Sequence, residues 1–168
     1  MKKIILSIII LVFLTAGCSG LYNLSSFILP DDTGFLTMIE ELDTPEKIGN
    51  YMVENFTYEM HDSTLTPYQL YKTNKGDCDD FAIFGIFIAN YNGYETYHIA
   101  IILENGMGHY LAVYVEDNKY NYSNNLNYYP INVLTFKEII SHSFKHSIWS
   151  KYIVYDYDMN IVEIRYNN

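Results

Sequence analysis

The residues from Gly76 to Asn90 read GDCDDFAIFGIFIAN, an acidic start followed by a long apolar run. From Phe81 to Ala89 the apolar side chains cover most of a helical circumference, which is typical of a helix buried at the centre of a domain. Gly85 interrupts the run at a cost of up to about 1 kcal/mol relative to alanine, so we expect a neighbouring element to pack closely against it. The stretch therefore predicts a central helix that begins near Cys78.

Two helix starts precede the central helix. Thr44 followed by Pro45 predicts a helix over residues 45–56, because threonine can accept hydrogen bonds from the first free amides and proline suits the first helical position. The pair Thr66-Pro67 repeats this signal and predicts a short helix that ends near Lys72.

The pattern changes after Asn92-Gly93, a plausible stop for the central helix. Tyrosine, isoleucine and valine then predominate, and the turn-forming pairs Asn105-Gly106 and Asp117-Asn118 separate the apolar runs. We predict strands over 96–103, 110–115 and 119–124, a helix opened by a capping box at Thr135 and ending near His146, and a last hairpin of 152–157 and 161–165. Helices followed by a mostly antiparallel meander define an α+β fold.

Length and charge restrict the possible functions. The chain has 168 residues, which suits one domain, and a formal net charge of -10 at pH 7. Such an acidic surface repels phosphate backbones, so we expect no nucleic-acid partner. Its two cysteines are too few for a disulfide scaffold or a cysteine-rich zinc site.

The first residues have the pattern of an export signal. Two lysines precede an apolar run from Ile4 to Leu14, which is shorter than the ~20 residues of a membrane span. The residues up to Cys18, LTAGC, resemble a bacterial lipobox, which implies that residues 1–17 are removed and that Cys18 is lipidated. We therefore expect residues 18–34 to form a lipidated N-terminus and tether, and residues 35–168 a domain on the exported face of the cell membrane. The alternatives are an ordinary signal peptide or a short uncut anchor.

Cys78 stands at the first turn of the predicted central helix. Amides without intrahelical acceptors and the helix dipole favour a thiolate there, and they can also hold the oxyanion of a tetrahedral intermediate. Asp77, Asp79 and Asp80 act in the opposite direction, because nearby carboxylates raise the pKa of a thiol. A nucleophilic Cys78 therefore needs a cationic partner, for which an imidazolium is the obvious group. The alternative is a small buried cysteine without chemistry, beside carboxylates that only place charge at a helix N-terminus.

Five histidines could supply this partner: His61, His98, His109, His142 and His146. His109 opens a strand just after a flexible loop, from which a base can reach a neighbouring helix, so we take it as the candidate base. His98 lies inside a strand and is expected to face either core or solvent. His142 and His146 share one face of the late helix and could bind a metal ion. No clear carboxylate or cysteine partner accompanies them, so a surface pair is favoured.

The hairpin after His109 places candidates for the residue that orients the imidazole. If Asp117-Asn118 is a two-residue turn, Asn124 lies on the same face as His109, diagonally beside it, and Asn125 points to the opposite face. The side-chain oxygen of Asn124 could then accept from the imidazole and fix its tautomer. Ser123 and Asn125 remain alternatives, because one bulge would invert the preference.

Three segments resemble the motifs of the transglutaminase-like (papain-like) cysteine enzymes. They are GDCDDFA from Gly76 to Ala82, GHY from Gly108 to Tyr110, and KYNYSN from Lys119 to Asn124. The resemblance runs from about Asp43 to Asn125 and implies a papain-like fold in which a buried helix packs on the sheet. It also implies Cys78 as nucleophile, His109 as base and Asn124 as orienting residue. The chain departs from the family in having Tyr110-Leu111 where a large residue such as tryptophan is usual, and asparagine for aspartate at the third position.

Residues and resemblance together predict a cell-envelope cysteine hydrolase that cleaves peptide or amide bonds through a thioester on Cys78. We expect a protein or peptide substrate, no cofactor, no metal, and membrane attachment through a lipid on Cys18. Two alternatives stay open: an amine-transferring transglutaminase, and a non-catalytic surface-binding lipoprotein on the same fold. Gln69 could supply an oxyanion donor, but a surface role suits glutamine better. Nothing in the sequence fixes an oligomeric state.

Overall fold

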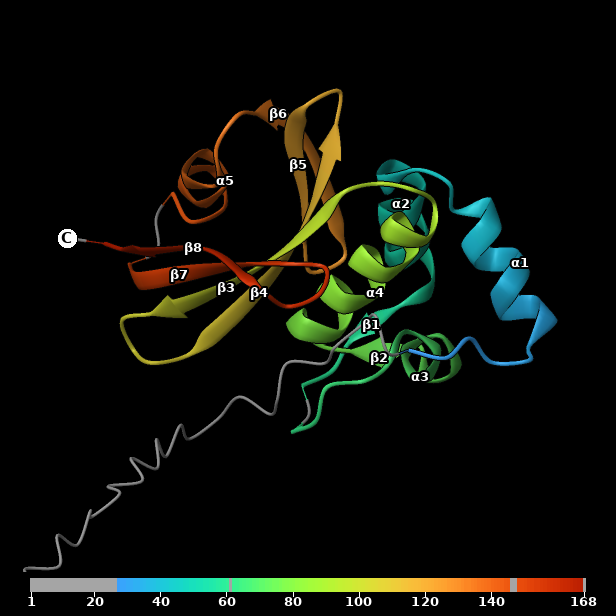
Figure 1. The fold of residues 1–168 in the computed structure, drawn as a ribbon. Coiled ribbons are helices and arrows are strands. Elements are labelled where there is room, and N and C mark those ends of the chain that lie inside the picture. Colours follow the sequence, from blue (N-terminus) through green and yellow to red (C-terminus); the bar gives the residue numbers. More distant parts are fainter. Residues whose placement is uncertain (1–26, 61, 146–147, 168) are drawn as a thin grey trace, which may run out of the picture.

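The computed structural model describes residues 27–60, 62–145 and 148–167, in which helices precede a sheet and one helix crosses back over it (Figure 1). The helices are α1 (Thr33–Glu41), α2 (Pro45–Asn55), α3 (Pro67–Thr73), α4 (Cys78–Tyr91) and α5 (Phe136–Ser143). The strands are β1 (Thr57–Tyr58), β2 (Lys75–Gly76), β3 (Thr96–Leu103), β4 (Gly108–Glu116), β5 (Lys119–Asn124), β6 (Asn127–Val133), β7 (Trp149–Asp156) and β8 (Ile161–Tyr166). The α+β class that the sequence predicts is confirmed.

The larger sheet is antiparallel, with the strand order β6-β5-β4-β3-β7-β8. Its β4–β5 hairpin turns through Asp117 and Asn118, whose φ angles of 51° and 61° are those of a tight two-residue turn. Glu116 pairs with Lys119, which is the predicted register. The two short strands β1 and β2 form a separate parallel pair that leads into α4.

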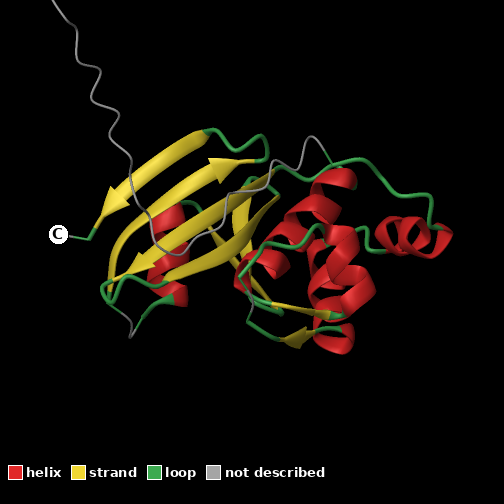
Figure 2. Cartoon of the chain, turned by 90° about the horizontal axis from the view of Figure 1, so that it is seen from below, coloured by secondary structure: helices red, strands yellow, loops and turns green. Residues whose placement is uncertain are grey.

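The sheet is covered on both faces, with α4 on one side and α5 on the other (Figures 1 and 2). On β4, Ala112 and Tyr114 join the core around α4, whereas Leu111 and Val113 join the core around α5. Such alternation follows from the two-residue period of a strand. Side chains on β4 therefore belong to one of two separate environments according to their position.

Helix α4 is the buried central helix that the sequence predicts. Every residue from Asp80 to Ala89 is buried. A Cβ atom at Gly85 would overlap the hydroxyl of Tyr114, so the glycine allows α4 to approach β4 closely. Within the described residues, no helix is both long and apolar enough to span a membrane.

Three elements differ from the prediction. Helix α1 begins at Thr33, inside the stretch assigned to the tether, and strand β6 lies where the sequence predicted no element. Helix α5 ends at Ser143, before His146. The tether does pack against the domain at Phe27, whose ring centroid lies 5.0 Å from that of Phe87.

Candidate active site

The start of α4 is held by a buried carboxylate. The backbone N–H of Asp77 donates to Oδ2 of Asp80 over 2.8 Å, and that of Leu65 donates to Oδ1 over 2.6 Å. Both bonds satisfy amides with a charged acceptor. Gly76 precedes them because a Cβ there would lie 2.8 Å from the Asp80 carboxylate. Asp80 is thus a structural residue that fixes the backbone on which Cys78 stands.

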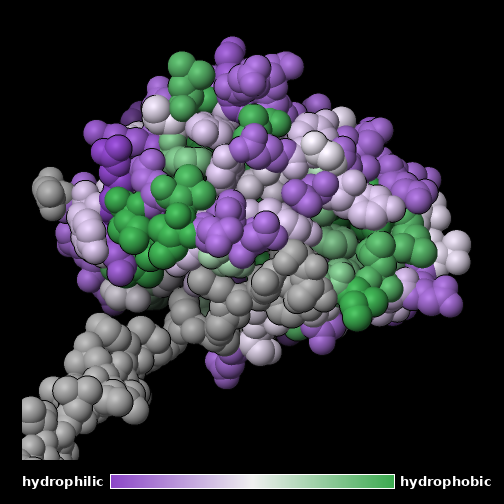
Figure 3. Space-filling model, viewed as in Figure 1, coloured by the Kyte–Doolittle hydropathy of each residue, from purple (hydrophilic) through white to green (hydrophobic). Residues whose placement is uncertain are grey.

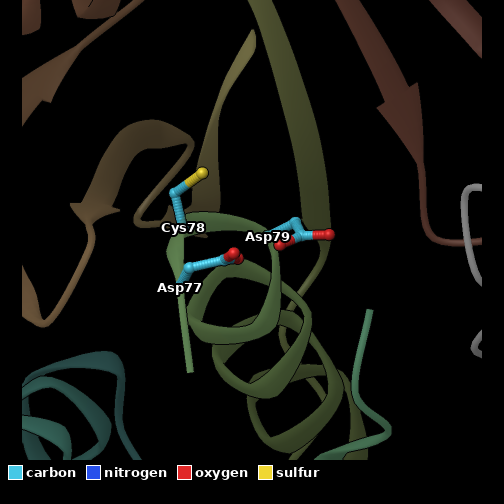
Figure 4. Close-up of side chains that lie close together, drawn as sticks. All are labelled: Asp77, Cys78 and Asp79. Atoms are coloured by element: carbon cyan, nitrogen blue, oxygen red, sulfur yellow. The ribbon is translucent and has the colours of Figure 1, made fainter. Parts of the chain in front are cut away.

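Cys78 is the first residue of α4, and its free thiol is partly exposed. Figure 4 shows the sulfur directed away from the carboxylates of Asp77 and Asp79, which turn toward each other. Burial, followed by the charges of Asp77 and Asp79, raises the pKa of the Cys78 thiol to about 12, although the backbone amides of Tyr110 and Asp79 act to lower it. Desolvation and the carboxylates therefore outweigh the amides, and the effect of the carboxylates is the opposing one that the sequence predicts at this position.

His109 and Asn124 meet as the hairpin register predicts. The Nε2 atom of His109 lies 2.8 Å from Oδ1 of Asn124. With that oxygen as acceptor, Nε2 carries the proton and Nδ1 is left as the basic nitrogen. The Nδ2 group of Asn124 donates over 3.0 Å to Oγ of Ser143 on α5, which fixes the amide. The ring of Phe144 adds an edge contact to the imidazole, with centroids 5.6 Å apart.

The Cys78 sulfur lies against the backbone of the residue that follows His109. The amide of Tyr110 donates toward the sulfur, and β5 pairs with β4 only from Leu111 onward. The thiol therefore meets β4 at the end of the strand, where the sheet edge is open. His109 itself lies on the α5 side, next to Asn124 and Phe144. Burial lowers its pKa, and the hydrogen bond with Asn124 partly offsets this effect.

A second imidazole occupies the α4 side of the same strands. His98 on β3 is 3% exposed, and its ring centroid lies 5.0 Å from that of Tyr110. Its Nε2 atom has no hydrogen-bond partner among the described residues. Burial lowers the pKa of His98 to about 4, and the charge of Asp79 only partly opposes this. His98 thus faces the core, one of the two orientations open to it from the sequence.

Among the described residues, one group could hold a metal ion: Asp77, Cys78 and Asp79, whose ligand atoms lie within 4.8 Å of one another. Burial opposes ionisation of Asp79, but hydrogen bonds from Asp77, Thr64 and its own amide lower its pKa overall. Two carboxylates fall short of the six to eight oxygen ligands, roughly, that calcium prefers. The group therefore places negative charge beside the sulfur and supplies only part of a cation site.

The other residues considered in the sequence have structural roles or lie outside the described residues. Gln69 accepts from the amide of Thr66 over 2.8 Å and closes the capping box of α3. His142 on α5 is engaged by the hydroxyl of Tyr122 at 2.8 Å. His61, His146 and Cys18 lie outside the described residues, so neither the histidine pair nor the lipidation site is placed.

Two residues close to the start of α4 escaped the sequence analysis. Tyr58 pairs with Gly76 in the short parallel ladder and lies close enough to Cys78 that the charges of Cys78, Asp77 and Asp79 add to burial in raising its pKa. Thr64 donates to Asp79 over 2.6 Å. The local sequence around Tyr58 and Thr64 predicts turns and helix starts. It does not predict which of these side chains contact the start of α4.

No family model matches the chain, and no curated protein matches it either. Solved structures do. LapG of Legionella pneumophila is 20% identical over 56% of this chain and 62% of its own, with a TM-score of 0.45. In its EGTA-treated form LapG is 16% identical over 71% of this chain and 70% of its own, with a TM-score of 0.49.

A protein from Cytophaga hutchinsonii, provisionally assigned as a cysteine protease, is 14% identical. The match covers 62% of this chain and 45% of that protein, with a TM-score of 0.44. Against the LapG structure first described, the chain spans about three fifths of the neighbour's length.

Proposed function

We propose that this chain is a cysteine hydrolase that acts on peptide or amide bonds through Cys78, His109 and Asn124. The observation that supports it is the pairing of His109 Nε2 with Asn124 Oδ1 at 2.8 Å, at the strand end where the Cys78 sulfur meets the amide of Tyr110. Nucleophile, base and orienting residue then come from α4, β4 and β5, as in a Cys-His-Asn arrangement.

The resting pair is neutral. The thiol has a raised pKa and the imidazole a lowered one, so at pH 7 the proton stays on sulfur. Catalysis then begins with Nδ1 of His109 as general base: it takes the thiol proton as the sulfur attacks the carbonyl carbon. The amides of Asp79 and Tyr110 donate toward the sulfur and so favour the negative charge that develops there as the proton leaves.

The remaining steps restore the enzyme. The imidazolium returns its proton to the leaving amine as the carbon–nitrogen bond breaks, which leaves a thioester on Cys78. Water, deprotonated by His109, attacks that thioester and releases the carboxylic acid and the free thiol. An amine in place of water would give amide exchange, which is the transglutaminase alternative.

The test traps the thioester. With p-nitrophenyl acetate as probe, the wild-type protein releases p-nitrophenol and gains one acetyl group on the peptide containing Cys78, detected by mass spectrometry. Cys78→Ser abolishes this acetylation and His109→Ala slows it strongly. Absence of acetylation in a folded protein whose Cys78 still reacts with iodoacetamide contradicts the proposal.

A non-catalytic surface-binding domain is the second candidate. It is favoured by the pKa of about 12 for the Cys78 thiol, which describes an unreactive group unless a base assists it. The rate of alkylation by iodoacetamide separates the two. A base-assisted thiol loses most of its reactivity at pH 7 in His109→Ala, whereas an inert thiol reacts slowly in both proteins.

The proposed location is the exported face of the cell membrane, with a lipid on Cys18. It rests on the LTAGC pattern after a short apolar run. In cells, Cys18→Ala should move the protein from the membrane fraction or block its processing. Mass spectrometry of the mature N-terminal peptide should show a diacylglyceryl group on Cys18, and an unmodified Cys18 would refute the anchor.

A further inference from the structure

The two edges of the larger sheet are protected to different degrees. On one side, β6 carries Pro130 and a register shift, and Asn132 has a positive φ of 52°. Proline and irregular backbone are devices that prevent edge strands from pairing with other chains. On the other side, the register of β8 against β7 shifts only near Ile161 and is regular from Glu163 to Tyr166. Within the described chain, β8 is the outermost strand on this side.

The free hydrogen-bonding groups of β8 can be assigned from its pairing. The amide of Asn167 donates to the carbonyl of Ser150 over 2.9 Å, so Asn167 faces β7. Because alternate residues of a strand face the same neighbour, Arg165 and Glu163 also direct their backbone groups to β7. The backbone groups of Ile164 and Tyr166 are therefore directed to the open edge.

The same strand exposes apolar side chains. Ile161, Val162, Ile164 and Tyr166 are 58%, 50%, 45% and 65% exposed, and Figure 3 shows hydrophobic side chains gathered over this end of the sheet. Ile164 pairs with Ile153 and Tyr166 with Lys151, so both lie on the sheet face opposite to α5. An apolar strip along an open edge is a typical pairing site.

The charged side chains of β8 indicate which strand can pair with it. Glu163 and Arg165, the only arginine of the chain, flank Ile164 symmetrically, and Arg165 Nε lies 3.0 Å from Glu163 Oε1 in a partly exposed ion pair. In an antiparallel pair centred on Ile164, each Glu163 lies opposite Arg165 of the second strand, and Ile164 lies opposite its own copy. We propose that two copies of this chain associate through β8 about a two-fold axis at Ile164, which extends the sheet across both molecules.

Other registers are less favourable. Centring the pair on Glu163 or Arg165 places like charges directly opposite each other. Centring it on Ile164 instead joins two residues whose backbone groups both face the open edge, so the central pair exchanges two hydrogen bonds. Such a contact is isologous and closes as a dimer rather than continuing into a filament.

A single short strand pair buries less than the ~1,200 Å² of a typical stable interface, and a net charge of -10 on each copy opposes association. We therefore expect a weak dimer with a Kd on the order of 10–100 μM. The inference is independent of the proposed hydrolase activity, because β8 lies on the far side of β3 and β7 from the strands that carry His109 and Asn124.

Sedimentation velocity of the full chain in a mild detergent, at protein concentrations from about 5 to 500 μM around the expected Kd, tests the dimer. The wild-type protein shifts from monomer to dimer over this range. Glu163→Arg and Arg165→Glu each abolish the shift at low salt, because like charges then face each other. The double variant Glu163→Arg/Arg165→Glu restores it, since the opposite charges still pair. Circular dichroism checks that each variant is folded.

Cross-linking gives a second readout at the axis. Ile164→Cys in a Cys18→Ala/Cys78→Ser background forms an intermolecular disulfide under mild oxidation, because Cα atoms of a hydrogen-bonded pair lie about 5.5 Å apart. Leu134→Cys, at an equally apolar residue that is 68% exposed elsewhere, does not. A wild-type protein that stays monomeric at every concentration overturns the proposal. Strand β8 would then be open to pairing with a different protein rather than with a second copy. A double variant that stays monomeric, or equal cross-linking of the Leu134→Cys control, also overturns it.

Discussion

His98 and His109 lie on the neighbouring strands β3 and β4, but they occupy opposite faces of the sheet. His98 is enclosed on the α4 side with its Nε2 unpartnered among the described residues, and its pKa falls to about 4. His109 is held on the α5 side by Asn124, whose hydrogen bond counteracts the effect of burial on its pKa. An imidazole acts as a base when one residue fixes its tautomer and another presents the proton to be taken. Of these two histidines, His109 has a residue that fixes its tautomer, namely Asn124.

The largest expected effect tests this contrast directly. His109→Ala should slow acetylation of Cys78 by p-nitrophenyl acetate by about 10³-fold, because general-base assistance contributes roughly 10²–10⁴. His98→Gln should slow it less than about tenfold, as expected of a residue that does not take the proton. Burst kinetics at pH 7 measure both variants.

The opposite order of these two variants would assign the base to His98 on the α4 side. Circular dichroism of each variant is the control, because a lost fold would slow both equally. Alkylation of Cys78 by iodoacetamide provides an independent comparison of the same pair.

Acid should destabilise the protein because His98, which is buried on the α4 face of the sheet, is protonated more readily in the unfolded chain. His98 has a pKa of about 4 when folded and about 6.5 when unfolded, so the unfolded chain takes up a proton first as the pH falls. Stability is complete above pH 6.5 and declines by about 3 kcal/mol as the pH falls to about 4. Urea denaturation between these pH values measures it.

The matched variant is His98→Gln, which cannot titrate. Its unfolding free energy should vary less over the same pH range, with the contributions of His109 and of carboxyl groups such as Glu138 and Asp79 remaining. Equal slopes for wild type and variant would show that His98 is already solvated or partnered in the folded protein.

The packing of the α4 side should tolerate no added methyl group at Gly85. Gly85→Ala drives a Cβ into the Tyr114 hydroxyl and should destabilise the protein by about 2 kcal/mol, as overpacked cores do. Tyr114→Phe removes the oxygen and should recover part of this loss in the double variant, although it also gives up the 3.0 Å hydrogen bond to Ser123. Thermal denaturation of the four proteins forms the double-mutant cycle, and purely additive effects would contradict the contact.

The smallest effect concerns the partner on the α5 side. Asn124→Ala should slow Cys78 acetylation about tenfold, because the imidazole remains but its tautomer is no longer held. Asn124→Asp should retain the rate and raise the pKa of His109, since a carboxylate favours the charged imidazole. The pH dependence of acetylation reports that shift, and an unchanged profile in Asn124→Asp would show that the two side chains do not interact.

Much of this arrangement could be read from local patterns. The continuous apolar run predicted α4, the β-branched and aromatic runs predicted β3 and β5 with the observed bounds, and the Asp117-Asn118 turn fixed the register that brings Asn124 to His109. In each case one local signal, such as a period or a turn, carries the information.

The remaining features depend on contacts between distant segments. Strand β6 contains Pro130 and two asparagines, so its strand character comes from pairing with β5 rather than from propensity. The approach of His98 to Asp79, and the raised pKa of Cys78, arise from desolvation in the folded core. No spacing along the chain encodes burial of this kind.

The hydrogen bonds of Asp80 bear on whether the Cys78 thiol can form a disulfide. One carboxylate joins the amides of Leu65 and Asp77 and so closes the intervening chain, which contains α3, into a loop. A disulfide is another way in which small domains close such loops. Here the clasp contains no sulfur, and the second cysteine of the chain is Cys18, far away in sequence. Within the described chain Cys78 therefore has no second thiol with which it could form a disulfide.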